Sequence, residues 1–278
     1  MRLISLALLL LLLTSGAIAQ GRNEKAPFKV LHADAVSHGE NRQELVGNVI
    51  IERDGIRLYA GRMVYTKDEG RLEAWRSVEI RDPSFNLKCS RLTLKTKENE
   101  AVAWGNPLLT QREDKSDKRF ETTLTGVQVR IFTKEKRVQV LEDVVLTRFE
   151  IKGQNRKVEL RVRCRSMDAL TGAKRSTFKG GLSIETPQIG ASAERALYDQ
   201  MANKFYLIGV AKAWNFDSSG RKVNLIEGDK IVYFTKEKRT VVIGNVTADV
   251  EPEIKTGERN IPVRLDPVSR PGEVLANE

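Results

Sequence analysis

The 278-residue chain has few of the side chains on which small exported scaffolds and many enzymes depend. It contains two Cys, two His and three Trp, and aromatic residues make up 6% of the sequence. So few Cys and His argue against a disulfide-stapled scaffold, a zinc module and a His-centred enzyme. We therefore expect no metal and no cofactor, and binding is favoured over catalysis.

Charged residues, in contrast, are abundant and mixed in sign. Lys and Arg number 47 against 37 Asp and Glu, which leaves a net charge of +10, and 40% of the residues are hydrophobic. A hydrophobic share of this size is enough to bury a core, so the composition argues against a wholly disordered chain. The basic excess suits an anionic partner without identifying it.

A long apolar run occurs at the N-terminus. Arg2 precedes residues 3–13, which are apolar apart from Ser5, and Ala17-Ile18-Ala19 forms an A-x-A-like cleavage site before Gln20. This pattern predicts a signal peptide over residues 1–19, cleaved after Ala19, and a periplasmic protein. An uncleaved anchor is the alternative, although the run is shorter than the roughly twenty residues of a membrane span.

Cleavage would remove only one charged residue, Arg2, so the net charge would fall from +10 to +9. The basic character therefore belongs to the mature chain. Nucleic acid is nevertheless not expected as a partner. The chain is predicted to be exported, and its aromatic residues do not interleave with basic ones at base-stacking spacing.

The rest of the chain repeats one short pattern. The template is an apolar residue, any residue, a small residue, a polar residue, a mostly basic residue, an apolar residue, any residue and a bulky residue. Copies begin at Leu58, Leu87, Leu124, Val162, Ala191 and Ile226. We expect repeats over residues 31–250, after an N-terminal segment over 20–30 and before a Pro-rich flexible tail over 251–278.

Each copy spans the same twenty positions, as from Leu58 to Val78, and the length variation falls between copies. The longest joins are 107–124 and 144–162, where we expect protruding loops. Within a copy, apolar residues recur at every second position, which is typical of half-buried strands, and charged turns such as 67–70 separate them. These features predict an all-β fold of repetitive antiparallel strands in two facing, open-ended sheets.

The repeat unit resembles that of the OstA-like family of lipopolysaccharide-transport periplasmic proteins, which includes the LptA-like proteins. The clearest matches are Ala33-Asp34, residues 44–51, Gly209-Val210 and Gly244-Asn245-Val246. The resemblance implies an open, slightly twisted β-jellyroll that holds the acyl chains of lipopolysaccharide between its sheets and carries the lipid between the inner and outer membranes.

The implied partners are lipopolysaccharide or a related glycolipid, and other lipopolysaccharide-transport proteins at both membranes. Further copies of the chain are also expected in head-to-tail contact, because the end strands of an open stack present unpaired backbone groups to another chain. Such a contact would extend as a filament.

The lipid-binding groove is predicted from the inward positions of the strands. Its candidate residues are Val49, Ile51, Leu58, Ala60, Leu72, Ala74, Val78, Ile80, Leu87, Cys89 and Leu207. Small residues recur at Ala60, Cys89, Gly126, Cys164, Ala193 and Gly228, where they would either widen the slot or let the sheets pack closely.

Basic residues at matched positions are candidates for contacts to an anionic headgroup. They are Arg62, Arg91, Arg195 and Lys230, which could line the rim of the slot and bind phosphates by charge-assisted hydrogen bonds. The alternative is a plain solvated face that needs no ligand.

Three smaller predictions concern the rare residues. Cys89 and Cys164 lie two units apart, near or beyond the roughly 7 Å limit for a disulfide, so buried thiols are favoured. His32 and His38 are expected on the surface. Trp75 and Trp104 share one repeat position and predict a stacked ladder on one face, for which packing is favoured over ligand stacking.

The function predicted from these features is lipopolysaccharide transport in the periplasm, without catalysis. The alternative is a structural β-polymer or scaffold without lipid cargo. A glycan-active enzyme using acids such as Glu52 and Glu79 is the weaker rival. The sequence contains no nucleophile elbow, glycine-rich phosphate loop or evident pair of catalytic carboxylates.

Overall fold

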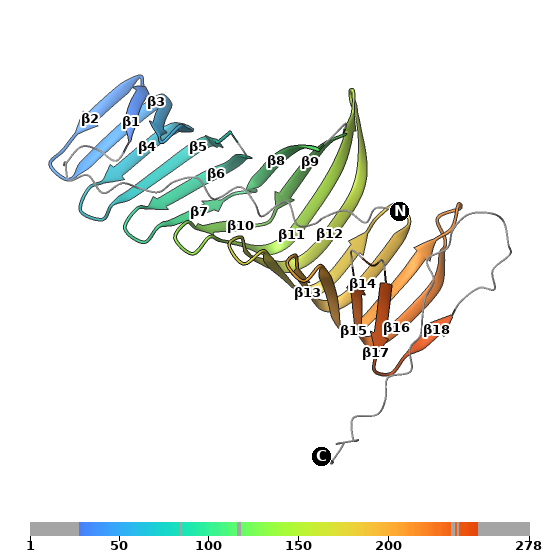
Figure 1. Ribbon diagram of the computed structural model, residues 1–278. Helices are drawn as coiled ribbons and strands as arrows, with labels where there is room; N and C mark the ends of the chain where they lie inside the picture. Colours follow the sequence, from blue (N-terminus) through green and yellow to red (C-terminus); the bar gives the residue numbers. More distant parts are fainter. Residues whose placement is uncertain (1–27, 84, 116–117, 235–236, 238, 250–278) are drawn as a thin grey trace, which may run out of the picture.

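The computed structural model describes residues 28–249, except 84, 116–117, 235–236 and 238. The predicted signal peptide and Pro-rich tail lie outside the described residues. The described part consists of strands and connecting turns and contains no helix (Figure 1). The all-β prediction is confirmed.

Alternating apolar residues form the strands, and Gly, Asp, Asn and Lys occupy the turns between them. The strands are β1 (Lys29–His32), β2 (Ala35–His38), β3 (Arg42–Arg53), β4 (Ile56–Thr66), β5 (Arg71–Arg81), β6 (Phe85–Lys95), β7 (Glu100–Trp104), β8 (Leu108–Lys115), β9 (Lys118–Thr125), β10 (Gln128–Phe132), β11 (Arg137–Lys152), β12 (Asn155–Leu170), β13 (Arg175–Glu185), β14 (Ile189–Asp199), β15 (Lys204–Phe216), β16 (Lys222–Phe234), β17 (Arg239–Ile243) and β18 (Thr247–Asp249).

Neighbouring strands pair antiparallel, and in the long pairs the register breaks near the middle of the strand. The break lies between Val46 and Val49 in the β3–β4 pair and between Trp75 and Val78 in the β5–β6 pair. Each long strand therefore contributes one segment to each of two sheets. In four places the two segments are separate strands, so that each pair corresponds to one long strand interrupted at the break. These pairs are β1/β2, β7/β8, β9/β10 and β17/β18.

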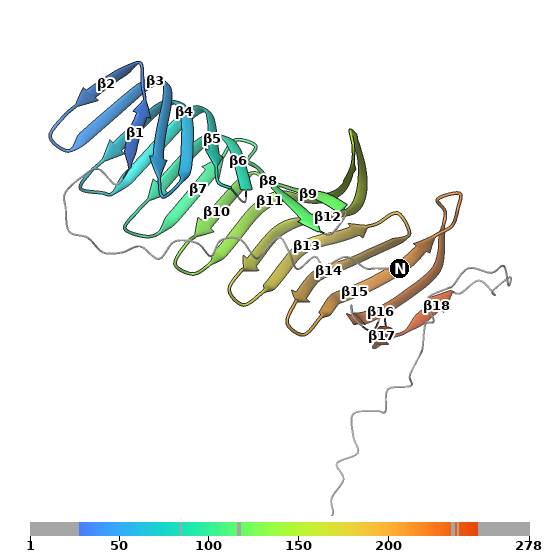
Figure 2. The ribbon, with the colours of Figure 1, turned by 45° about the horizontal axis from the view of Figure 1, so that its top comes forward.

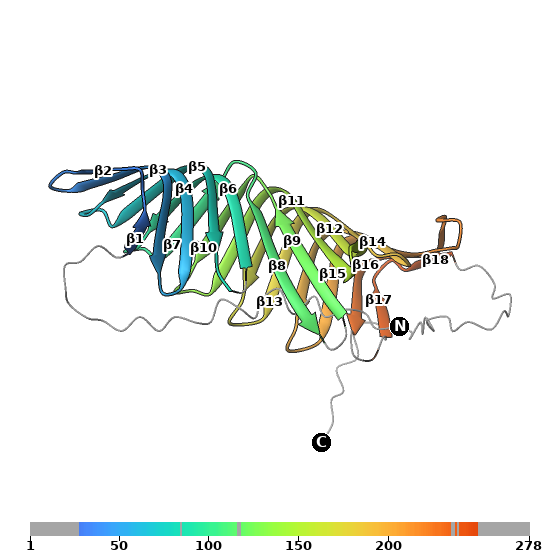
Figure 3. The same ribbon diagram turned by 90° about the horizontal axis from the view of Figure 1, so that it is seen from above.

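The first sheet contains β2, β7, β10 and β17 with the strand halves that pair with them, and the second sheet contains β1, β8, β9 and β18 with the other halves. In Figures 2 and 3 the strands lie side by side along an elongated molecule, in two layers. Inward side chains of both sheets form a single hydrophobic core. The two-sheet antiparallel prediction is confirmed.

Longer strands, and not loops, fill the two long joins between copies. Leu108 pairs with Thr125, and the β8–β9 pairing continues to Lys115 and Lys118, while β11 and β12 are 16 residues long each. Figure 1 shows the β11–β12 hairpin rising beyond the neighbouring turns. The prediction of protruding loops was wrong, because these segments keep the strand alternation and pair with each other as extensions of the second sheet.

Candidate functional site

The space between the two sheets is the candidate site, because the inward side chains of every unit meet there. All of the predicted groove residues belong to the single core, and the most exposed of them, Ile80, is 9% exposed. Leu72, Ala74 and Leu207 come from the first sheet and the others from the second. They point inward because side chains alternate between the two faces of a strand. Their contact with lipid stays a prediction.

Protein side chains pack closely in this interior. A Cβ added to Gly126 would lie 2.6 Å from a methyl carbon of Val140, and one added to Gly228 would lie 2.5 Å from a methyl carbon of Val242. At these two positions the small residue is needed for close packing, which favours the packing interpretation there. Ala60, Cys89, Cys164 and Ala193 are buried in the core. An acyl chain entering the interior would have to displace contacts between the sheets.

One edge of the space between the sheets is bordered by partly buried apolar side chains. The two halves of each strand join at its central break, so the sheets meet along that line and their far ends form the opposite edge. The far ends carry apolar residues that pack on the core without being fully buried. They include Tyr65, Leu94 and Phe205 on the first sheet and Ile56, Phe85 and Ile184 on the second. This apolar border is the open edge, or mouth, of the slot between the sheets, and it is the candidate entrance for a lipid.

The closed edge is a corner built from pairs of residues with positive φ. Gly47 and Asn48 have φ of 77° and 45°, and the Asn48 side chain donates a hydrogen bond to the Asp34 carboxylate at 3.2 Å. Equivalent pairs are Arg76–Ser77, Gly105–Asn106, Glu142–Asp143, Gly180–Gly181, Gly209–Val210 and Gly244–Asn245. Such φ values bend the strand from one sheet to the other, which explains why Gly and Asn recur at this position.

A glycine stands on one side of each of these corners. At the Gly47–Asn48 corner, the glycine belongs to the positive-φ pair and faces Asp34. At the Arg76–Ser77 corner, the pair has no glycine, and Gly61 on the facing strand takes that place. An added Cβ would lie 2.0 Å from the Asp34 carboxylate oxygen in the first case and 2.9 Å from the Arg76 Cβ in the second. The close approach of the two strands therefore requires one glycine, on either side, and this is why the repeat motif is degenerate in sequence.

The extended hairpins add a charged cluster that the sequence interpretation missed. Arg148 of β11 is 6% exposed, and its guanidinium lies 3.4 Å from the Glu113 carboxylate and 3.6 Å from that of Glu159. The guanidinium also lies 4.2 Å from the centre of the Phe120 ring. Burial lowers the pKa of Arg148 and raises that of Glu159, with Glu113 and Glu159 opposing the first shift and Arg148 the second.

The position of this cluster follows from strand alternation. Val144 and Leu146 of β11 point into the core, and Arg148 lies two residues further on the same face. At this part of the mouth, charged side chains therefore follow the apolar residues that line the slot. The change from Val and Leu to Arg and Glu along β11 is the sequence signal that could have identified it.

The predicted headgroup residues lie beside the corner, on the outer face of the first sheet, and not at the mouth of the slot. Arg62 pairs across the sheet with Trp75, and Trp75 pairs with Arg91. Arg62 also hydrogen-bonds to Glu44 at 2.7 Å. The expected rim location was wrong, because these residues alternate with inward neighbours such as Met63 and so point outward. Arg195 and Lys230 occupy the same row of the sheet.

The two tryptophans share this outer face but do not stack on each other. Arg91 of β6 lies between them, with its guanidinium 5.9 Å from the Trp75 ring centre and 5.6 Å from that of Trp104. The predicted stacked ladder is thus corrected to an alternating Arg–Trp row. Cation–π contacts of this kind stabilise partly exposed rows by about 0.5–1 kcal/mol each.

The cysteines and histidines lie where they were predicted. Cys89 and Cys164 are free and buried, and β8, β9 and β11 separate their strands in the second sheet, which is far more than a disulfide can span. Burial raises the pKa of both thiols to about 11. His32 and His38 are exposed.

Neither a metal site nor a membrane-crossing helix emerges among the described residues. No group of three or more His, Cys, Asp or Glu side chains in this part of the chain is arranged to hold a metal ion. None of its segments forms a helix of the length and hydropathy needed to cross a membrane.

A family model covers most of the described residues. Residues 32–239 match a family model described as "LptA/(LptD N-terminal domain) LPS transport protein". Among solved structures, LptH from Pseudomonas aeruginosa, titled the LptA homologous periplasmic component of the lipopolysaccharide transport device, is similar at 16% sequence identity. That match covers 45% of this chain and 82% of LptH, with a TM-score of 0.37. A search of curated proteins finds no match. Because the family match runs from the end of β1 to the start of β17, through both sheets, the chain belongs to the family of LptA and LptD N-terminal domain lipopolysaccharide-transport proteins.

Proposed function

We propose that this protein carries lipopolysaccharide across the periplasm with the acyl chains held between its two sheets. Family membership supports a role in lipopolysaccharide transport and a periplasmic location. The observation that carries the finer proposal is the unbroken apolar interior, which extends from Leu45 on β3 to Val242 on β17 and has partly buried apolar residues along one edge.

Solvation energetics explain why a transport protein needs such an interior. Each methylene of an acyl chain that is exposed to water costs about 0.8 kcal/mol, so a free lipid does not leave a membrane readily. Entry between the sheets replaces contacts among the inward side chains of the core with contacts to the acyl chain. The exchange keeps both surfaces out of water, and the continuity of the core gives the lipid a path along the molecule.

The sugar part of the lipid would remain outside the slot. The Arg148–Glu113–Glu159 cluster ends the apolar lining on the extended hairpins. A buried charge network of this kind excludes an acyl chain, because an acyl chain would leave the charges without polar neighbours. The long hairpins thus limit how far the acyl chains extend at this part of the mouth.

The ends of the molecule support head-to-tail contact with further copies or with other transport components. Among the described residues, β1 and β2 pair only with β3, and β17 and β18 pair only with β16. One edge of each end strand is therefore open to another chain. Joining the β1/β2 end of one copy to the β17/β18 end of the next would continue both sheets and the interior.

Engineered cysteines test this end-to-end contact. Ala35 on β2 and Ile243 on β17 are exposed and both belong to the first sheet, so we expect a mixture of Ala35→Cys and Ile243→Cys proteins to form disulfide-linked pairs. Each variant alone is the matched control, since a head-to-tail contact does not bring like ends together. Pairs formed equally within each variant alone would contradict the proposed polarity.

Calorimetry tests the binding mode. Burial of acyl chains in an apolar slot gives a negative heat-capacity change, which is a robust mark of apolar burial. We expect intact lipopolysaccharide to bind with such a change and its fully deacylated form to lack it. Equal heat-capacity changes for both forms, or no binding of the intact lipid, would contradict the proposal and favour the structural β-polymer.

A further inference from the structure

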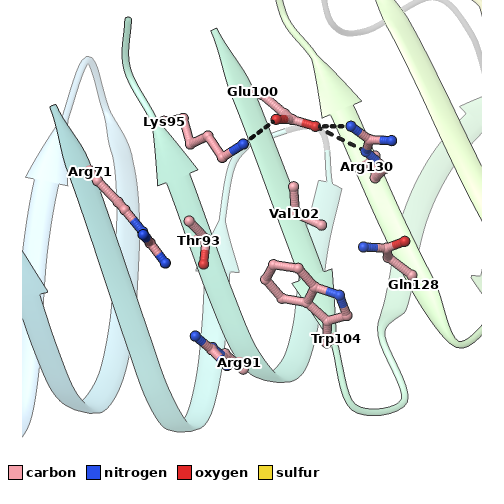
Figure 4. Close-up of a pocket in the computed structure, with 9 residues that line it drawn as sticks. All are labelled: Arg71, Arg91, Thr93, Lys95, Glu100, Val102, Trp104, Gln128 and Arg130. Atoms are coloured by element: carbon pink, nitrogen blue, oxygen red, sulfur yellow. Dashed lines mark hydrogen bonds and ion pairs between the residues drawn. The ribbon is translucent and has the colours of Figure 1, made fainter. Parts of the chain in front are cut away.

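The outer face of the first sheet carries a hollow that is separate from the slot between the sheets (Figure 4). It measures about 360 Å³, in the lower part of the roughly 300–1,000 Å³ range of small-molecule sites. Its lining residues are Arg71, Arg91, Thr93, Lys95, Glu100, Val102, Trp104, Gln128 and Arg130. They come from β5, β6, β7 and β10.

The hollow exists because two short side chains lie among long ones. Thr93 and Val102 face each other on β6 and β7, and long side chains from the rows on both sides overhang them. β10 lies beside β7 although the β8–β9 hairpin separates them in the sequence, and it adds Gln128 opposite Trp104. The topology thus assembles this surface from distant segments.

Two polar atoms in the hollow have no hydrogen-bond partner. Thr93 is 3% exposed and its hydroxyl is unpaired, and the Nε of Arg71 is also buried and unpaired. A buried polar group without a partner is costly and is uncommon in folded proteins. Both groups line the same hollow, so a ligand that displaced the overhanging side chains would gain hydrogen bonds that the protein alone does not form.

The charge of the hollow favours an anion. The Glu73 carboxylate is shared by Arg71 and Arg91, each at 2.8 Å, and the Glu100 carboxylate is shared by Lys95 at 3.0 Å and Arg130 at 2.5 Å. Arg71 also lies 3.6 Å from the Glu69 carboxylate, so four cations share three carboxylates, of which Glu100 lines the hollow. Each guanidinium has five N–H donors, so donors remain available for a phosphate.

The rest of the lining suits a sugar ring. Trp104 presents an aromatic surface beside the amide of Gln128, its partner across the β7–β10 pair. An aromatic surface packs against the apolar face of a sugar, and an amide donates and accepts hydrogen bonds with hydroxyl groups. An acyl chain would gain little here, because most of the lining is charged or polar.

We propose that this outer hollow binds a phosphorylated sugar. The phosphate lies among Arg71, Arg91 and Arg130, the Thr93 hydroxyl donates to it, and the ring packs on Trp104. The sugar belongs either to lipopolysaccharide itself or to a soluble glycan. The site is independent of lipid binding between the sheets, because it lies on the opposite face of the first sheet.

Fluorine NMR of the mature chain labelled with 5-fluorotryptophan tests this site. The three tryptophans give three signals, and titration with glucose 1-phosphate is expected to shift the Trp104 signal to saturation. The Trp214 signal should stay in place, because Trp214 lies on β15, away from the hollow. Glucose and inorganic phosphate, titrated separately, should bind at least tenfold more weakly than the sugar phosphate.

Substitutions with matched controls test whether the Thr93 hydroxyl and the Arg130 guanidinium bind the sugar phosphate. Thr93→Val is expected to weaken binding about fivefold while leaving the unfolding midpoint unchanged or higher, because it removes an unsatisfied hydroxyl without changing shape. Thr177→Val, on the same outer row of β13, is its control. Arg130→Gln is expected to weaken binding about tenfold or more. Its control, Arg175→Gln, removes an outer-face arginine that is paired with Asp199 outside the hollow.

Two results would overturn the proposal: a Trp104 signal that does not move with glucose 1-phosphate, or inorganic phosphate binding as tightly as the sugar phosphate. Fully deacylated lipopolysaccharide distinguishes the two sources. A shift of Trp104 by this saccharide assigns the hollow to the transported lipid, and a shift by glucose 1-phosphate alone assigns it to a soluble glycan. Failure of acyl-chain binding between the sheets would leave the Trp104 result unchanged.

Discussion

On β6, Leu92 is fully buried between the sheets, whereas its neighbours Arg91 and Thr93 belong to the outer face. The inward face of the first sheet is apolar from one unit to the next, and any apolar side chain of suitable size serves there. The outer face consists of particular pairs, such as Glu100 between Lys95 and Arg130. Because successive side chains of a strand point to opposite faces, the same strand contributes to a continuous apolar surface suited to lipid and to a local surface suited to polar ligands.

The largest expected effect comes from truncating the inward face. Leu92→Ala should lower the free energy of unfolding by about 2–5 kcal/mol, because it removes buried methyl groups and leaves a cavity. Leu170→Ala is the matched control, since Leu170 is 41% exposed and should change stability by less than about 0.5 kcal/mol. Urea denaturation measures both. Equal losses would show that the two faces are not energetically distinct.

The corner that joins the two sheets should be the next most sensitive feature. Gly47→Ala combines a φ of 77° with a contact of 2.0 Å to Asp34, whereas Gly55→Ala has a φ of 80° and open space around it. We expect a loss of about 1–2 kcal/mol for Gly55→Ala from the backbone alone. Gly47→Ala should lose about 1–3 kcal/mol more through overpacking. Thermal unfolding distinguishes them, and a smaller loss at Gly47 would refute the close-packed corner.

The outer face should make stability depend on pH in a way that the inward face does not. Burial by itself raises the pKa of Glu100, but hydrogen bonds from Arg130 and Lys95 outweigh it and hold the pKa below its usual 4.5. The ionised carboxylate therefore stabilises the folded state above about pH 4.5, and this contribution is lost as the pH falls through the folded pKa.

Glu100→Gln should consequently flatten the loss of stability in acid. Urea denaturation between pH 7 and pH 3 measures the slope, and Glu98→Gln, in the adjoining turn, is the control for a simple loss of charge. An unchanged slope in Glu100→Gln would show that the shared carboxylate does not contribute to acid sensitivity.

The smallest effect concerns thiol chemistry in the interior. Cys89 and Cys164 are 8% and 7% exposed, and burial raises the pKa of both to about 11, so the reactive thiolate is scarce at neutral pH. We expect a water-soluble thiol reagent to label neither residue in the folded protein and both in urea, as counted by mass spectrometry. Rapid labelling of the folded chain would indicate a slot that is open without lipid.

The inward face could be predicted from the sequence more fully than the outer face or the corners. Alternation at Val49, Ile51 and Leu58 identifies inward residues because each strand is buried on one face, and the copies of the repeat predict facing sheets. The corner glycine was harder to recognise, because it occurs on either of two facing strands, as at Gly47 and Gly61.

The outer hollow and the charged cluster depend on which strands become neighbours. Gln128 lies beside Trp104 only because the β8–β9 hairpin lets β10 pair with β7. Arg148 contacts Glu113 and Glu159 from two other strands of the extended hairpins. Such partners lie far apart in the sequence, so the repeat pattern alone does not reveal them.

Site-specific photo-crosslinking in the periplasm tests the central proposal, acyl chains between the sheets, most directly. A photoreactive residue is placed at inward Ile51, Leu87 or Leu207, and at outward Glu52 or Lys88 on the second sheet as controls. We predict crosslinks to lipopolysaccharide from the inward positions and none from the outward ones. Silence at the inward positions in a folded, expressed protein, or equal crosslinking from both sets, would contradict transport between the sheets.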